Sequence, residues 1–432
     1  MYGCQQNLIK PDYDLKSILE FICWESHKLI NCGIYYGRQL FFKAQKIIGK
    51  YDLEKEYKSN KHYQALYSQA AQQILRSVAE SFKSFKELNK KYKKGNLYFQ
   101  PRIPKYRKKD GLAMVKYPKQ GLILVGNNIR IPLGTTVKRW FKLDSFLIPM
   151  PSNLKFSDIK ELRILPRNRC FYVEFVYKKK IVVQEELNPK NVLGIDPGIN
   201  NWLSCVSNVG TSLIIDGRKV KSLNQWYNKR VSILKEGKPQ GYWDEQLAHI
   251  TEKRNRQMRD AVNKAARLVV NHCIKHQIGT IVFGWNQGQR QEVNLGKQTQ
   301  SFVQIPTAKL KQRVKQLCEE HNIKFVETEE SYTSKASFLD GDFLSTFGEK
   351  PERWKASGKR VKRGMYQTGK GLLVNADLNG AANILLKVET QLGISLVKVC
   401  RQVLTLATRF SIWETKTKKA TRCGFSPYCS NS

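Results

Sequence analysis

The chain changes its hydrophobic periodicity twice, and these changes restrict what it can fold into. Residues 15 to 93 place apolar side chains every three or four positions with almost no proline or glycine, which predicts a bundle of helices. From Gly95 to about Val183, short apolar runs alternate with proline and glycine, which predicts antiparallel strands in a small barrel-like module. The pattern changes again at Pro189, and we place a domain boundary near residue 188.

From Asn191 onward the segments alternate between strands and helices. A strand VLGID is followed by two more strands, WLSCVSN and SLIIDG, and by a long amphipathic helix through Leu247 and Cys273. Strand TIVFG, helix TAKLKQRVKQLCEE, strand KFVET, a basic insertion and helix ADLNGAANILLKV complete the series. This order matches an RNase H-like fold. We therefore expect an α+β multidomain protein, with an N-terminal helical lobe and a small β-barrel before an RNase H-like α/β domain.

The charge of the chain predicts a polyanionic partner. Lys and Arg number 75 against 36 Asp and Glu, a formal net charge of +39. Basic residues cluster between Lys86 and Lys116 and between Lys350 and Lys370, and aromatic residues alternate with them in KKYKKGNLYFQPRIPKYRKK. Phosphate neutralisation combined with base stacking is typical of nucleic-acid binding. The alternative is a solvated charged face without a partner.

Other partners and compartments are disfavoured. No apolar run approaches the roughly 20 residues that a membrane span requires, and the N-terminus has no secretory pattern. We expect a cytoplasmic, nucleoid-associated protein that does not bind membranes. Ten cysteines are scattered, and only Cys423 and Cys429 lie close together, so neither a disulfide framework nor a paired-cysteine zinc site is indicated.

Three carboxylates stand where the backbone would hold them rigidly. Asp196 ends the strand VLGID, Glu330 follows the strand KFVET, and Asp377 lies in the first turn of the last helix. If these strands are neighbours, the three acids converge. Mg²⁺ or Mn²⁺ prefers such hard oxygen ligands, and a pair of ions about 4 Å apart can activate water for phosphodiester cleavage. The pattern indicates a metal-dependent nuclease.

Each acid also has a purely structural interpretation. An Asp at a strand end or helix start can cap backbone N–H groups. Glu330 can equally be a surface acid beside Glu327 and Glu329, and by residue chemistry alone it is the least determined of the three.

Two segments carry a resemblance to a known family. GIDPGINN and NADLNGAANI resemble the first and third RuvC motifs of the TnpB (OrfB) proteins, transposon-encoded relatives of the type V CRISPR effectors. The resemblance covers nearly the whole chain. It implies an RNA-guided DNA endonuclease with a split RuvC-like domain, in which Asp196 and Asp377 are the catalytic aspartates, and it implies guide RNA and target DNA as partners.

The chain departs from the family pattern in two places. The usual second motif has a glutamate at the end of the strand that here reads TIVFGWNQG, where Gly284 and Trp285 stand. Some branches have a glutamate in an ESYTSK motif on the following strand instead, which here is Glu330. Many relatives also carry two CxxC pairs between the second and third motifs, whereas this chain has no cysteine between Cys318 and Cys400. Structural zinc is therefore not expected.

The resemblance assigns roles to the predicted segments. We expect the eight basic residues of the insertion KPERWKASGKRVKRGMYQTGKG, together with Trp354 and Tyr366, to contact substrate DNA. Oligomeric state is left open. The segments are a helical recognition lobe at 1–95, a wedge-like β-barrel at 96–188, a first RuvC-like part at 189–339, a target-binding insertion at 340–371, a second RuvC-like part at 372–410 and a flexible tail at 411–432.

The leading hypothesis is a Mg²⁺-dependent, RNA-guided DNA endonuclease encoded by a transposable element. Asp196, Glu330 and Asp377 would hold the metal, although Glu329 remains an alternative to Glu330. A first rival is a guide-RNA-dependent DNA-binding protein without cleavage activity, motivated by the missing acid at Gly284. A second is a DNA strand transferase, which is disfavoured because such enzymes usually end with Glu on the closing helix.

Overall fold

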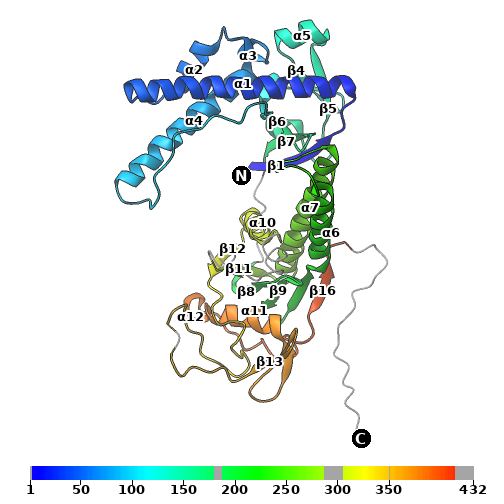
Figure 1. Cartoon of the computed structure of the whole chain (residues 1–432). Helices are drawn as coiled ribbons and strands as arrows, with labels where there is room; N and C mark the ends of the chain where they lie inside the picture. The colour runs from blue at the N-terminus through cyan, green and yellow to red at the C-terminus, as the bar shows by residue number, and fades with distance from the viewer. Residues whose placement is uncertain (1, 180–186, 287–304, 350, 414–432) are drawn as a thin grey trace. The chain divides into compact units, whose positions relative to one another are not determined.

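The computed structural model describes residues 2–179, 187–286, 305–349 and 351–413. The chain is a mixed α/β protein with several sheets, and it divides into two compact units, Met1–Lys179 and Lys180–Ser432 (Figure 1). The division falls a few residues before the boundary predicted near residue 188. Each unit is described separately.

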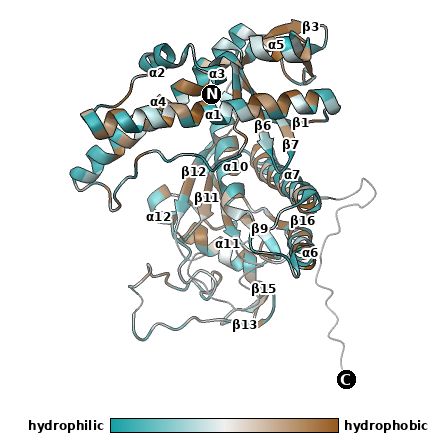
Figure 2. Cartoon of the chain, turned by 45° about the horizontal axis from the view of Figure 1, so that its top comes forward, coloured by the Kyte–Doolittle hydropathy of each residue, from teal (hydrophilic) through white to brown (hydrophobic). Residues whose placement is uncertain are grey.

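Unit 1 contains the predicted helices. α1 begins at Asp12, whose side chain accepts a hydrogen bond of 2.8 Å from the Leu15 N–H. α4 buries a stripe of apolar residues with helical spacing, and its Phe82 packs so closely on α1 that a Cβ at Gly37 would lie 2.6 Å from the ring. Figure 2 shows apolar and polar residues alternating along both helices. The helical prediction for 15–93 is confirmed by α1 (Tyr13–Ala44), α2 (Lys50–Tyr57), α3 (Lys61–Gln64) and α4 (Ser68–Lys93).

The strands of unit 1 form two sheets where the sequence predicts a single barrel-like module. The first has the order β1-β7-β6-β2 and the second the order β3-β4-β5. The N-terminal strand β1 was not predicted, because YGCQQNLI shows no alternation; it pairs antiparallel with β7 along its whole length. The elements are β1 (Tyr2–Ile9), β2 (Val115–Pro118), η1 (Lys119–Gly121), β3 (Ile123–Val125), β4 (Asn128–Pro132), α5 (Thr135–Phe141), β5 (Ser145–Pro149), η2 (Phe156–Asp158), β6 (Ile159–Arg167) and β7 (Cys170–Lys178).

Unit 2 is built on a six-stranded sheet with the order β12-β11-β8-β9-β10-β16. β8, β9 and β10 form an antiparallel meander, β11 and β12 run parallel to β8, and β16 runs parallel to β10. Five of the strands were predicted from their apolar runs. They are β8 (Asn188–Pro197), β9 (Asn201–Ser207), β10 (Ser212–Asp216), β11 (Ile278–Gly284) and β12 (Lys324–Thr328), and β16 (Thr408–Ser411) completes the sheet.

Helices cover both faces of this sheet (Figure 1). Alternate residues of β8 separate two cores: Leu193 and Ile195 pack with α7 and α10, whereas Val192 packs with α11. The helices are α6 (Arg218–Lys235), α7 (Glu245–Lys275), α10 (Thr307–Glu320), α11 (Ala376–Leu386) and α12 (Glu389–Leu392), and a small sheet comprises β13 (Lys359–Lys362), β14 (Met365–Gln367) and β15 (Leu373–Asn375).

The C-terminal segment requires a correction. The flexible tail was predicted to start at residue 411, but Ser411 pairs with Asp216 in β10, and Ile412 is buried. The Trp413 indole N–H donates a hydrogen bond of 3.0 Å to Asp260. The folded unit therefore extends at least to Trp413, because these residues close the sheet edge. The remaining tail, with Cys423 and Cys429, lies outside the described residues.

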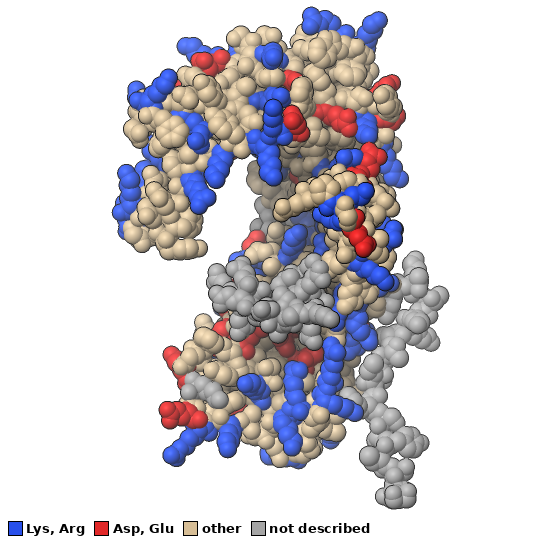
Figure 3. Space-filling view, viewed as in Figure 1, with Lys and Arg blue, Asp and Glu red and all other residues tan. Residues whose placement is uncertain are grey.

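No helix in the described part of the chain is long and apolar enough to span a bilayer. Lys and Arg side chains are spread over the visible face of each unit and outnumber the acids there (Figure 3).

Candidate carboxylate site

Asp196 lies at the end of β8 on the sheet face that α11 covers. Alternation along the strand puts Gly194 and Asp196 on the same face, and a Cβ at Gly194 would lie 2.7 Å from the Ala381 carbonyl of α11. A Cβ at Gly380 would lie 2.7 Å from Asp196 Oδ2. The helix therefore passes directly over the carboxylate, and glycine at position 380 leaves the space that Asp196 occupies.

Asp377 lies in the first turn of α11, one turn before Gly380. It is not the cap of this helix, because the Asn375 side chain accepts the hydrogen bonds from the Asp377 and Leu378 N–H groups at 3.0 and 3.1 Å. The Asp377 carboxylate instead accepts a hydrogen bond of 2.7 Å from Asn201, and Arg360 lies 3.5 Å from its other oxygen. The carboxylate is thus directed away from the helix backbone and remains partly exposed.

Glu330 follows β12 and reaches toward the end of β11. Its N–H donates a hydrogen bond of 2.9 Å to the Asn286 side chain. A Cβ at Gly284 would lie 2.9 Å from Glu330 Cγ and 3.2 Å from the Ile195 carbonyl of β8. The stem of Glu330 therefore packs over Gly284, the strand end where the second family motif would carry its own glutamate.

The neighbouring acids have different partners. Glu329 forms an ion pair with Lys387, the residue that follows α11, and Glu327 forms one with Lys311 of α10 at 2.7 Å. Partial burial raises the pKa of Glu329, but hydrogen bonds from Lys387 and Ser331 outweigh this effect and hold that pKa below its ordinary value. Glu330 is the better candidate for the site because its own stem packs over the end of β11 at Gly284.

Two buried asparagines of α11 fix the loop that follows Glu330. Asn379 donates to the Ala336 carbonyl at 2.7 Å and accepts from the Phe338 N–H at 3.0 Å. Asn383, one turn later, donates to the Thr333 carbonyl at 2.8 Å. The same helix thus carries Asp377, accommodates Asp196 and anchors the Glu330 loop. Both asparagines belong to NADLNGAANI, but the motif alone gave no reason to assign them this role.

A basic cavity of about 800 Å³ opens beside Asp377. Five cationic side chains line it, from α6, the β13–β14 hairpin and β16: Arg218, Lys221, Arg360, Arg363 and Arg409. Such a lining would attract a phosphate backbone toward the carboxylate. Arg360 and Arg363 belong to the basic insertion that the sequence assigns to DNA contact. The other three cations were not assigned to the site, because the elements that carry them are distant in the chain.

The carboxylates have the donor chemistry that Mg²⁺ or Mn²⁺ prefers, and glycines at 284 and 380 give two of them room. In the described part of the chain, however, no three His, Cys, Asp or Glu side chains lie close enough together to hold an ion as they stand. α11 carries Asp377 and passes over Asp196, and the stem of Glu330 packs over the end of the neighbouring strand β11.

Two carboxylates, Asp340 and Asp342, accept hydrogen bonds that hold the basic insertion in place. Asp340 accepts hydrogen bonds from Ser337 and from the Gly369 N–H at 2.6 Å each, and Asp342 accepts from the Ser337 N–H at 2.7 Å. One prediction for this segment is wrong: Tyr366 is only 1% exposed, and its hydroxyl donates to the Lys335 carbonyl, so it is not placed to contact DNA.

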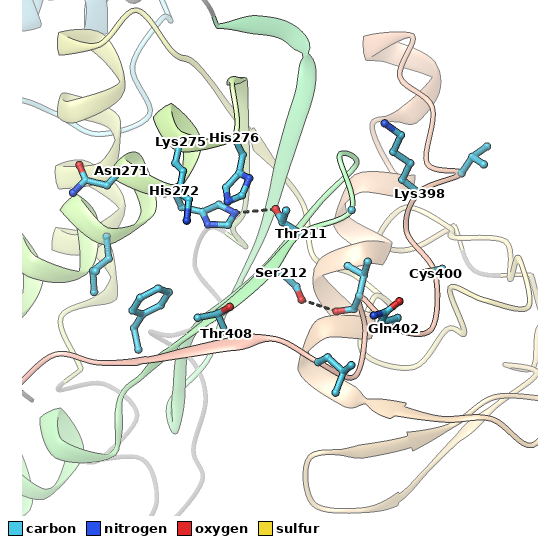
Figure 4. Close-up of a pocket in the computed structure, with 16 residues that line it drawn as sticks. Thr211, Ser212, Asn271, His272, Lys275, His276, Lys398, Cys400, Gln402 and Thr408 are labelled. Atoms are coloured by element: carbon cyan, nitrogen blue, oxygen red, sulfur yellow. Dashed lines mark hydrogen bonds between the residues drawn. The ribbon is translucent and has the colours of Figure 1, made fainter. Parts of the chain in front are cut away.

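A second cavity, of about 830 Å³, lies on the same unit and contains none of the three acids (Figure 4). His272 of α7 and His276, the residue that follows this helix, line it with their ring centroids 4.4 Å apart. His272 Nε2 lies 2.9 Å from the Thr211 hydroxyl. Burial, with smaller contributions from His276 and Lys275, lowers the pKa of His272 to about 4.

Comparison with solved structures gives only a distant likeness. A Cas12f1–sgRNA–target DNA complex matches with 16% identity and a TM-score of 0.33, covering 89% of this chain and 98% of the other. CasPhi-2 (Cas12j) bound to crRNA matches with 10% identity and a TM-score of 0.36, covering 90% and 98%. At these TM-scores the likeness defines neither the fold nor the activity of this chain.

Sequence comparison finds similarity to one family. The OrfB_IS605 family model, described as a probable transposase, matches residues 173–288. These residues include Asp196 and the β8–β11 core of the sheet. A TnpB-like protein, ORF457 of Acidianus two-tailed virus, is 26% identical over 404 residues, covering 84% of this chain and 81% of the viral protein. Both findings are similarities to the TnpB (OrfB) proteins, and they agree with each other.

Proposed function

We propose that this protein is an RNA-guided, Mg²⁺-dependent DNA endonuclease of a transposable element, with a RuvC-like site formed by Asp196, Glu330 and Asp377. The proposal rests chiefly on α11, which passes over Asp196 and carries Asp377 beside a cavity lined by five cations. The strand order of unit 2, a meander followed by two parallel strands, is also that of an RNase H-like domain. The chain would represent a branch with a relocated second-motif glutamate and without zinc-binding cysteines.

Each acid has a distinct part in the proposed site. Asp196 and Asp377 would hold the metal from the strand and the helix, and Glu330 would complete the set from above Gly284. The bound ion would supply activation of water and neutralisation of charge at the scissile phosphate. The cationic side chains of the cavity other than Arg409 would position the DNA backbone, because guanidinium groups bind phosphate oxygens in two-pronged geometry.

Unit 1 offers a surface that suits a guide RNA. On α1 the Arg38 guanidinium lies 5.3 Å from the centre of the Phe42 ring and 5.5 Å from that of Tyr106. Both rings are about half exposed, at 56% and 48%. Exposed aromatic rings beside a fixed cation provide stacking platforms for unpaired bases. We assign this surface to guide binding and the basic insertion of unit 2 to target DNA.

The test is guided cleavage by the full chain purified with its native transcript. DNA matching the guide should be cut when Mg²⁺ is present. Asp196→Ala should bind the same RNA and the same target without cutting. No cleavage by the wild type, or equal cleavage by Asp196→Ala, would reject the proposal.

A second candidate is a guide-dependent DNA-binding protein that does not cut. It is favoured by the absence, among the described residues, of three acids already within reach of one ion. Target binding by the wild type that needs the guide but yields no Mg²⁺-dependent product would select this candidate.

A further inference from the structure

The Asp377 carboxylate is held from the sheet edge as well as from its own helix. Asn201, at the start of β9, donates a hydrogen bond of 2.7 Å from Nδ2 to Asp377 Oδ2. Arg409, on the terminal strand β16, donates from Nη1 to Asn201 Oδ1 at 2.9 Å. Residues far apart in the chain thus form a continuous line from Arg409 through Asn201 to Asp377.

The chemistry of the three groups permits one arrangement. A guanidinium can only donate hydrogen bonds, and an ionised carboxylate can only accept them. Asn201 must therefore turn its carbonyl oxygen toward Arg409 and its NH₂ toward Asp377. Without the arginine, the amide could rotate by half a turn and place its oxygen against the carboxylate, where two acceptors repel each other.

Arg409 is itself held in place. Asp216 of β10 lies 3.4 Å from its Nη1 and also binds Arg218, whose Nε donates to Asp216 at 2.8 Å. Burial raises the pKa of Asp216, but hydrogen bonds from Arg218 and the charge of Arg409 outweigh this and lower that pKa. An ionised Asp216 therefore anchors Arg409 at neutral pH.

We propose that Arg409 is a positioning residue that acts through Asn201 to set the orientation of the Asp377 carboxylate, an inference that rests on the proposed function. The arrangement engages Oδ2 of Asp377, while Oδ1 lies 3.5 Å from Arg360 Nη2. The terminal strand thereby becomes part of the active-site architecture.

The test compares Arg409→Met and Asn201→Leu with a control that removes the same charge elsewhere. Arg401→Met is suitable, because Arg401 is exposed, lies in the same C-terminal segment and does not line the basic cavity. The full chain with its guide RNA is assayed for cleavage over a range of Mg²⁺ concentrations, for target binding and for thermal unfolding.

The inference predicts a change in metal dependence. Arg409→Met and Asn201→Leu should each raise the Mg²⁺ concentration for half-maximal cleavage by about tenfold, the usual effect of removing a group that orients a metal ligand. The double variant should be no worse than the more affected single variant, because both act on one path. Target affinity and unfolding temperature should remain close to those of Arg401→Met.

Binding of Mn²⁺ provides a readout that does not require cleavage. Electron paramagnetic resonance would measure the Mn²⁺ that the wild-type complex binds in excess of an Asp377→Ala complex. Arg409→Met should weaken this excess binding. Excess binding at unchanged affinity in Arg409→Met would overturn the inference and leave the proposed function standing, whereas no excess in the wild type would reject the proposed function itself. A loss confined to target affinity would instead make Arg409 a phosphate contact and also overturn the inference.

Discussion

Two cavities of nearly equal volume, about 800 and 830 Å³, lie in unit 2 and share one strand. Arg409 of β16 lines the basic cavity beside Asp377, whereas its neighbours Thr408 and Phe410 line the histidine cavity (Figure 4). Successive side chains of a strand point to opposite faces, so three consecutive residues at the sheet edge contribute to two cavities. Size does not distinguish the two cavities, but their chemistry does.

The two cavities differ in the charged groups that line them. The basic cavity gathers five cations around a carboxylate that accepts hydrogen bonds from a fixed amide. In the histidine cavity, burial keeps His272 neutral around pH 7, because its pKa is lowered to about 4. A phosphodiester binds to cationic side chains and a divalent ion binds to carboxylates. Of these two cavities, the basic cavity is the one that combines both kinds of charge. We conclude that the charged side chains lining a cavity, rather than its volume, identify the candidate site.

The largest expected effect contrasts the two cavities directly. Asp377→Asn should reduce guided cleavage on the order of 10³-fold or more, since it removes a proposed metal ligand. His272→Gln should change the rate by less than about twofold, as expected for a residue outside a catalytic unit. Single-turnover cleavage rates at saturating guide and target would measure both. Similar losses in the two variants would remove the basis for preferring the basic cavity.

The next effect tests whether Glu330 takes the place of a glutamate at position 284, the end of β11. Gly284→Glu should lower cleavage about 100-fold, because its Cβ would lie 2.9 Å from Glu330 Cγ and 2.5 Å from Ile384 Cδ1. Combining it with Glu330→Ala removes the contact with Glu330 Cγ, leaves the contact with Ile384, and returns a carboxylate from β11. The double variant should therefore cut at least about tenfold faster than Glu330→Ala alone, a non-additivity expected of residues in contact.

Gly284→Ala combined with Glu330→Ala is the matched control for this exchange, because it fills position 284 without an acid. Equal rates for the two double variants would show that Glu330 does not occupy the second-motif position.

Removal of the shared strand should have a moderate effect. A chain ending at Ala407 loses Arg409, the parallel pairing of β16 with β10 and the bond from Trp413 to Asp260. We expect it to cut about tenfold more slowly, given the loss of a group that orients Asp377, and to unfold at a lower temperature. A chain ending at Trp413 should match the full-length protein in both measurements. Full activity of the shorter chain would contradict any role for β16.

The smallest effect belongs to the histidine cavity and concerns stability. The folded-state pKa of His272 is about 4, below the ordinary value of 6.5, so between these values only the unfolded chain binds the proton. Stability is therefore present above pH 6.5 and is lost as pH falls toward 4. From about 1.36 kcal/mol per pH unit, the loss between pH 7 and 5 is about 2 kcal/mol.

Urea unfolding of His272→Gln should show a correspondingly weaker pH dependence than the wild type. His249→Gln, an exposed position on the same helix, is the control and should keep the wild-type pH dependence. An unchanged profile in His272→Gln would mean that the histidine is not held neutral by its surroundings.

Much of unit 2 was predictable, because its central strands are continuous apolar runs and its helices are strongly periodic. The turn after VLGID and the start of ADLNGAAN also indicated where Asp196 and Asp377 would stand. By contrast, β1 contains a polar run, Cys4-Gln5-Gln6-Asn7, and is defined only by its partner β7. The four residues of β16 are too few for a periodic signal, and their partner β10 lies almost 200 residues earlier.

The placement of Glu330 depended on contacts that no local pattern contains. Its loop is fixed by Asn379 and Asn383 of a helix about 50 residues later, and its stem needs the missing side chain of Gly284. The ion pairs of Glu327 and Glu329 likewise depend on a lysine of α10 and on the lysine that follows α11. Sequence reasoning could propose the acid but could not choose it from its neighbours.

The most direct test of this choice is single-turnover cleavage by Glu330→Gln beside Glu329→Gln, each loaded with the same guide and the same matched DNA. We predict that Glu330→Gln loses at least about 100-fold in rate while retaining guide and target binding, and that Glu329→Gln stays within about fivefold of the wild type. Normal cleavage by Glu330→Gln, with the loss falling on Glu329→Gln, would contradict the assignment of the site.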